Sequence, residues 1–132
     1  MPAIVATTAL SLTLLVGLAD QQLNPNNPRA FDFRGALEQI RKEARPGDTV
    51  VYAPDYLRDV VGYYSPGVRT QALSDAAAHG MPQRGHVFLL ASFLDDPGIA
   101  AQVGTGRYDL DRKPHRLIRT ITRDRIRIWE YS

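Results

Sequence analysis

The sequence contains no cysteine, which excludes disulfide bonds, a thiolate nucleophile and any zinc site built on cysteine. Lysine is nearly absent and occurs only at positions 42 and 113, so almost all of the positive charge is arginine. The 16 basic and 14 acidic residues leave a formal net charge of +2, without a concentrated basic block. We therefore expect no nucleic-acid partner.

Several motifs for catalysis and nucleotide binding are also missing. The chain has no G-x-x-x-x-G-K-[ST] phosphate loop and no G-x-S-x-G nucleophile turn. The short run Gly104-Thr105-Gly106 follows an expected helix, which is not the position of a dinucleotide-binding loop. The three histidines, His79, His86 and His115, lack the spacing of a metal-binding pair. We expect no cofactor and no metal site, and we assign no catalytic residue.

The chain begins with an uncharged apolar stretch at residues 1–19. A membrane-spanning helix needs roughly 20 mostly apolar residues, a length that this stretch just reaches. Three interpretations are open: a transmembrane helix or the last part of one, an atypical signal or anchor, and a buried first element of a soluble domain. We favour the first. Residues 20–30 are rich in asparagine and proline and are expected to form a linker, and residues 31–132 one α/β domain.

Apolar runs and helical patterns alternate along residues 31–132. The runs at residues 49–53, 68–73 and 86–92 have the character of strands. We expect helices at residues 33–44, 56–64 and 75–79, and a fourth from Pro97 to the Gly104-Thr105-Gly106 run.

The last part of the domain has a different pattern. Residues 116–122 and 125–131 alternate in polarity, which predicts an antiparallel hairpin. The expected fold is therefore α/β, with a mostly parallel, three-layer, Rossmann-like sheet. The C-terminal hairpin would close it, and the apolar helix of residues 1–19 would precede it.

Polar residues follow each expected strand, and ligands of open α/β sheets bind beyond the carboxyl ends of the strands. The candidate ligand-binding residues are Asp55, Tyr56, Ser92, Asp95 and Asp96. Converging carboxylates could hold a divalent cation or supply a general base. The simpler interpretation, which we favour, is that these residues cap the helices that follow. Ser74 and Asp75 after the middle strand have the same two interpretations.

Two further residue groups have competing interpretations. The tyrosines at positions 52, 56, 63 and 64 are expected to pack in the core, the alternative being contact with membrane headgroups or a partner. The arginines of the hairpin are expected to form a solvated face and not an anion-binding surface. They are Arg116, Arg119, Arg123, Arg125 and Arg127.

One more pattern bears on function. An apolar segment and a linker precede the sequence DFRGALEQIRKEARPGDTVVY at residues 32–52. It resembles the C-terminal end of bacterial GT-C-type membrane glycosyltransferases, in the group of protein mannosyltransferases and aminoarabinose transferases. The shared elements are the Phe33-Arg34-Gly35 helix start, the Arg45-Pro46-Gly47-Asp48 turn, the Val50-Val51 strand and the Tyr63-Tyr64 pair. The resemblance covers residues 30–132 and the helix before them.

The resemblance implies an extracytoplasmic domain at the cell membrane, above the active-site cavity of an enzyme that transfers sugars from polyprenyl-phosphate donors. In that family the catalytic carboxylate lies in an early loop of the multi-pass membrane part, so no catalytic residue carries over to this chain. The implied partners are the membrane and, through the membrane part, the sugar donor and the acceptor.

By the same resemblance the chain is a fragment of such an enzyme or a short stand-alone relative. It would not be catalytic by itself and would contribute to acceptor recognition or gating. The alternative is a small ligand-binding or structural α/β module without enzymatic activity.

Overall fold

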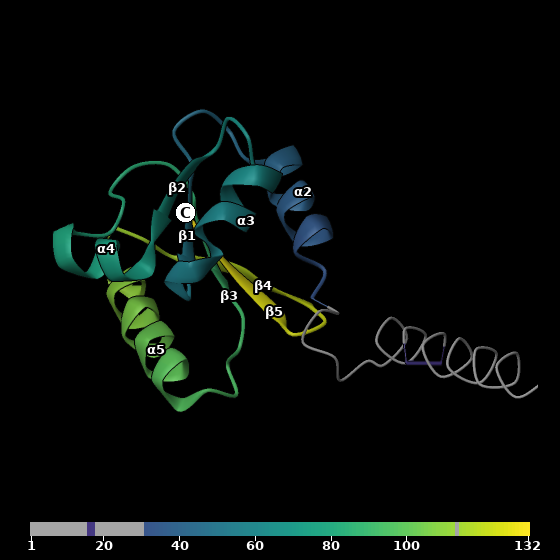
Figure 1. Ribbon diagram of the computed structural model, residues 1–132. Helices are drawn as coiled ribbons and strands as arrows, with labels where there is room; N and C mark the ends of the chain where they lie inside the picture. Colours follow the sequence, from purple (N-terminus) through teal and green to yellow (C-terminus); the bar gives the residue numbers. More distant parts are fainter. Residues whose placement is uncertain (1–15, 18–30, 113) are drawn as a thin grey trace, which may run out of the picture. The chain divides into compact units, whose positions relative to one another are not determined.

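The computed structural model describes residues 16–17, 31–112 and 114–132 (Figure 1). The chain divides into two units, Met1–Phe31 and Asp32–Ser132. The expected linker, and the expected apolar helix except for Val16 and Gly17, lie outside the described residues. Within the described part of the chain, no helix combines the length and the apolar character needed to cross a membrane.

Five strands form one sheet in the order β2-β1-β3-β5-β4. The strands are β1 (Thr49–Ala53), β2 (Arg69–Ala72), β3 (Val87–Ala91), β4 (Leu117–Arg123) and β5 (Ile126–Tyr131). Strand β1 pairs in parallel with β2 and β3, whereas β5 pairs antiparallel with β3 and β4. The α/β class and the hairpin are confirmed. The sheet is mixed and not mostly parallel, because the pairings of β5 equal the parallel pairings in number.

Helices cover both faces of this sheet. They are α2 (Phe33–Glu43), the 3-10 turn η2 (Asp55–Leu57), α3 (Arg58–Tyr64), α4 (Leu73–His79) and α5 (Pro97–Asp111). Figure 1 shows α2 and α3 together on one side of the sheet and α4 and α5 on the other, so the domain has three layers. The chain passes from β1 outward to β2 and then back across to β3. Because parallel crossovers are right-handed, this reversal puts α3 and α4 on opposite faces.

Burial on both faces explains the continuous apolar runs of β1 and β3, in which every residue is buried. On one face, Val51 and Leu89 belong to a cluster that also contains Leu73 of α4 and Val103 of α5. Residues between them in the strands, such as Val50, point to the other face, because successive side chains of a strand alternate. Strand β4 is the least buried of the five and forms an edge of the sheet.

Asp32 fixes the start of α2. Its Oδ1 accepts a hydrogen bond from the backbone N–H of Gly35 at 2.8 Å. Its Oδ2 accepts one from Nη1 of Arg123 at 2.8 Å. The absence of a Cβ at Gly35 leaves room for that ion pair, since a Cβ there would overlap both side chains. One carboxylate therefore caps the first helix of the domain and joins it to the end of β4.

The turn between α2 and β1 is organised by Asp48, whose side chain is buried. Its Oδ2 accepts the backbone N–H of Arg45 and its Oδ1 accepts that of His86, both at 2.7 Å. The carboxylate thus links the turn before β1 to the residue before β3. Gly85 packs its backbone against Gly47 at a positive φ of 76°, and a Cβ there would collide with the carbonyl group of Gly47. The amino ends of these two parallel strands are consequently held together.

Two boundaries differ from the sequence-based expectation. Helix α5 continues through Gly104-Thr105-Gly106 to Asp111, where we expected it to end. The cause is packing: Gly106 is buried against Leu73, whose Cδ1 would lie 2.6 Å from a Cβ at that position. Close contact between α4 and α5 offsets the low helix propensity of glycine. Helix α4 begins at Leu73, so Ser74 lies inside the helix and is not its cap.

Candidate functional site

The carboxyl edge of the parallel strands is the natural place to look for a site. Helix α3 follows β1 on one face, and α5 follows the neighbouring β3 on the other. The loops after β1 and β3 therefore diverge, and ligands of open α/β sheets bind in the crevice that such a divergence creates. All five candidate residues lie in these two loops or at their boundaries with the helices.

Asp55 is exposed after β1 and contacts the start of α4. Its Oδ2 accepts a hydrogen bond from Oγ of Ser74. Neither residue caps a helix, because the N-cap positions belong to Pro54 and Ala72 and make no side-chain hydrogen bond. The capping interpretation is therefore wrong for Asp55 and Ser74. Their hydrogen bond instead joins the loop after β1 to the helix after β2.

Arg58 brings positive charge to the same corner. Its Nη2 lies 4.0 Å from a carboxylate oxygen of Asp75. A hydrogen bond to Tyr52 and the charges of Asp75 and Asp55 raise the pKa of Arg58 above its ordinary value. The guanidinium therefore remains charged and offsets the two nearby carboxylates.

Tyr56 connects the two diverging loops. Its ring makes an edge contact with the ring of Phe93, with a centroid distance of 5.8 Å. Partial burial and the negative charge of Asp96 both raise the pKa of the Tyr56 hydroxyl. The side chain remains 66% exposed, so its outer edge is available to a ligand.

Ser92 and Asp96 have structural roles. Ser92 is fully buried and its backbone N–H donates to the carbonyl of Ala53 at 3.2 Å. Asp96 caps α5, because its Oδ1 accepts the backbone N–H groups of Gly98 and Ile99 at 2.8 and 3.0 Å. Of the proposed helix caps at this edge, the structure confirms Asp96.

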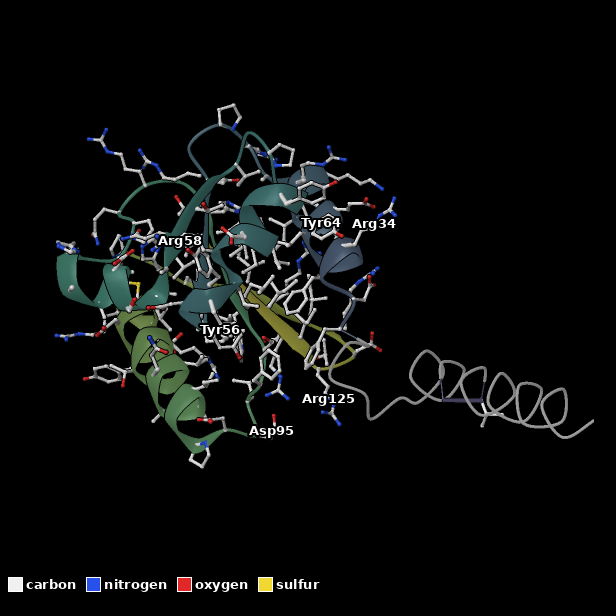
Figure 2. All side chains as sticks on the ribbon, in the orientation of Figure 1. Arg34, Tyr56, Arg58, Tyr64, Asp95 and Arg125 are labelled. Atoms are coloured by element: carbon white, nitrogen blue, oxygen red, sulfur yellow. The ribbon has the colours of Figure 1, made fainter. Side chains whose placement is uncertain are left out.

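Asp95 has a different environment from its neighbour. It lines a hollow of about 310 Å³ between the loop after β3 and the turn of the β4–β5 hairpin. Other residues around it are Leu94, Thr122, Asp124, Arg125, Ile126 and Arg127. Figure 2 shows Asp95 and Arg125 toward the same end of the domain. This volume lies at the small end of the usual range for small-molecule sites, roughly 300–1,000 Å³.

The hairpin residues of this hollow are the part that sequence reasoning missed. They belong to it because β5 runs antiparallel to β3, which brings the hairpin turn beside the carboxyl end of β3. The hairpin arginines are all exposed, in agreement with the expected solvated face, and two of them also make ion pairs. Arg119 bonds to Glu130 and Glu43, and Arg123 bonds to Asp32. The predicted hairpin next to the last parallel strand was the one available indication.

The tyrosines and histidines are divided among several roles. Core packing is confirmed for Tyr52 only, since Tyr63 is 78% exposed and contacts Tyr64 edge to face at a centroid distance of 4.9 Å. His86 pairs with Glu130, and the buried His115 contacts the carbonyl of Pro82. Among the described residues, no three histidine or acidic side chains are arranged so that they could hold a metal ion.

The carboxyl edge is therefore not one cluster of the five candidates. Asp55 with Ser74 and Asp96 with α5 maintain the fold, whereas Asp95 and the outer edge of Tyr56 face solvent. The chemistry that this arrangement offers is hydrogen bonding and charge recognition of a polar molecule. Comparison of the chain with protein-family models, with curated proteins and with solved structures finds no match.

Proposed function

We propose that residues 31–132 form the non-catalytic extracytoplasmic domain of a membrane glycosyltransferase that uses polyprenyl-phosphate-linked sugars. The observation that carries this proposal is the junction between α2 and β1. The segments that resemble the glycosyltransferase group, Phe33-Arg34-Gly35 and the Arg45–Asp48 turn, begin α2 and join it to β1. Asp48 and Gly47 hold the turn before β1 against the residues before β3. The resembling Arg45–Asp48 segment therefore has a role in the folding of the domain.

In this role the domain contributes to acceptor recognition or gating through the carboxyl edge of its sheet. In the parallel half, β2-β1-β3, the chain moves from β1 to one neighbour and then to the other, and ligands of open α/β sheets bind where the strand order changes in this way, which supports a ligand-facing edge there. The exposed ring of Tyr56 and the carboxylate of Asp95 are the groups that an acceptor would meet. The donor sugar and the reacting groups belong to the membrane part of the enzyme.

Two measurements on the full chain test the proposal. Transfer of sugar from a polyprenyl-phosphate donor to a peptide or lipid acceptor is expected to stay at background, and robust turnover would refute the non-catalytic role. Flotation with vesicles of phosphatidylcholine alone is expected for residues 1–132 and not for residues 31–132. Equal behaviour of the two chains would contradict attachment to the membrane through residues 1–19.

A second candidate function is favoured by the hollow that Asp95 lines. In this alternative the chain is a small-ligand binding domain without enzymatic activity. A thermal-shift screen with divalent cations and sugar phosphates would detect a ligand as a rise in Tm. Asp95→Asn should abolish the rise, whereas Asp59→Asn, which removes an exposed carboxylate of α3, should preserve it. Absence of any shift would rule out this candidate for the ligands tested.

A further inference from the structure

The amino edge of the sheet, opposite the edge just described, carries a larger hollow. It measures about 490 Å³ and lies between the turn before β1 and the turn before β2. Its lining residues are Arg41, Ala44, Arg45, Pro46, Gly47, Asp48, Pro66, Gly67, Val68 and Arg69. The first of these belong to the end of α2 and the following turn, and the last three lead into β2. Parallel pairing of β1 with β2 brings the two turns together.

Three arginines surround this hollow, and none has a carboxylate partner within 4.0 Å among the described residues. They are Arg41, Arg45 and Arg69. Four other described arginines do make such pairs, for example Arg34 with Glu38 and Arg123 with Asp32. The three guanidinium groups therefore keep their hydrogen-bond donors available.

Asp48 is the one carboxylate among the lining residues, and it is turned away from a ligand. Its side chain is buried, and each of its oxygens accepts a backbone N–H, from Arg45 and from His86. Three arginines against one internally bonded aspartate leave the hollow with an excess of positive charge. An anion would meet guanidinium groups without displacing an existing ion pair.

The walls of the hollow are held in place before any ligand binds. The first turn is fixed by Asp48 and by the close approach of Gly85 to Gly47. The second turn is closed by a hydrogen bond from the N–H of Val68 to the carbonyl of the buried Ser65, at 3.2 Å. Prolines at positions 46 and 66 restrict both backbones further. A preorganised site loses less entropy when it binds.

We infer that this hollow binds a phosphate group carried by a small molecule or by a lipid headgroup. The planar guanidinium group donates two parallel hydrogen bonds to phosphate oxygens, which makes arginine the side chain best suited to this recognition. The hollow is larger than a phosphate needs, so the group would be an ester of a larger molecule. Phosphate binding here would hold whether or not the domain belongs to a glycosyltransferase.

Titration calorimetry of the full chain with inorganic pyrophosphate, at low ionic strength, tests the inference for a soluble source. Arg45→Gln and Arg69→Gln should each weaken the affinity about tenfold, the loss expected for a charge-assisted hydrogen bond. The matched control is Arg116→Gln, which removes the same charge beside β4, at the other side of the sheet from β2, and should change the affinity less than about twofold. Circular dichroism should give the same folded spectrum for all variants, because the three side chains are exposed.

Vesicle sedimentation separates the lipid source from the soluble one. For a lipid phosphate, the wild-type chain should bind vesicles containing phosphatidic acid more tightly than vesicles of phosphatidylcholine alone. Arg45→Gln and Arg69→Gln should remove that difference, and Arg116→Gln should keep it. Selective weakening by the two hollow variants in either assay supports the inference. Equal weakening by Arg116→Gln, or no binding in both assays, overturns it.

Discussion

The two edges of the sheet hold their charged groups in different ways. At the carboxyl edge, acidic side chains contact hydroxyl, guanidinium or helix N–H groups, as Asp55 and Asp96 do. At the amino edge, Asp48 is buried in backbone contacts, and the arginines around it have no carboxylate partner in the described chain. The usual rule for α/β sheets directs attention to the carboxyl edge. In this domain, the other edge is the one where three arginines without a carboxylate partner line a single hollow.

The largest expected effect comes from removing the carboxylate that organises the amino edge. Asp48→Ala should lower the free energy of unfolding by about 3 kcal/mol, because two hydrogen bonds from buried backbone N–H groups to a charged acceptor are lost. Asp55→Ala at the carboxyl edge should cost less than about 1 kcal/mol, since its contact is exposed. Urea denaturation of both variants measures the difference. Equal losses would mean that the two edges are held in the same way.

A second comparison concerns apolar packing beside the carboxyl edge, where α5 approaches the first residue of α4. Gly106→Ala should destabilise the domain by about 1–3 kcal/mol, because its Cβ would overlap Leu73. Gly104→Ala in the same helix is the matched control. No atom lies within 4 Å of a Cβ there, and the variant should gain about 0.5–1 kcal/mol. Thermal unfolding that moved in the same direction for both variants would contradict this account of α5.

Replacing the adjacent aspartates Asp95 and Asp96 at the carboxyl edge should change the free energy of unfolding by a smaller amount. Asp96→Ala should cost about 1 kcal/mol, because it removes the cap of α5. Asp95→Ala should stay within about 0.5 kcal/mol of the wild type, since it contacts no helix N–H. Guanidinium denaturation separates the two. A larger loss of stability for Asp95→Ala than for Asp96→Ala would contradict this prediction and would show that Asp95 stabilises the fold.

The smallest expected effect is on the titration of Tyr56. Burial and the charge of Asp96 raise its pKa in the folded protein, so the folded state favours the protonated hydroxyl. The resulting contribution to stability is fully present below about pH 10, the unfolded value, and is lost as the pH rises through the folded pKa. Tyr56→Phe should reduce the alkaline loss of stability slightly. Absorbance titration of Asp96→Asn should show a lower pKa for one tyrosine, and an unchanged curve would contradict the coupling.

The sequence was sufficient to predict the helices and strands that are determined by neighbouring residues. Strand β1, helix α2 and the hairpin were predicted, since each depends on residues close together in the sequence. The end of α5 was not predicted, because the reason for tolerating Gly106 is a contact with Leu73, far away in the chain. The Asp55–Ser74 hydrogen bond was missed for the same reason, as it spans 19 residues.

For the candidate sites, too, the sequence predicted only what depends on neighbouring residues. Polar residues after β1 and β3 could be placed at one edge from the sequence, but which of them cap and which face a hollow depends on geometry. The arginine hollow at the amino edge was not predicted at all. Arg41, Arg45 and Arg69 meet only because β1 pairs with β2, and sequence reasoning examined the ends of strands and not their beginnings.

Asp32 also determines how the domain would respond to mechanical force. Its two carboxylate oxygens hold the first turn of α2 and Arg123, which is 91 residues further along the chain. Tension applied to the backbone at Phe31 would therefore reach the first helix and the last hairpin together. Unwinding of the helix from its amino end would also strain the exposed ion pair to β4. A pull from the amino-terminal side would consequently be shared by elements from both ends of the domain.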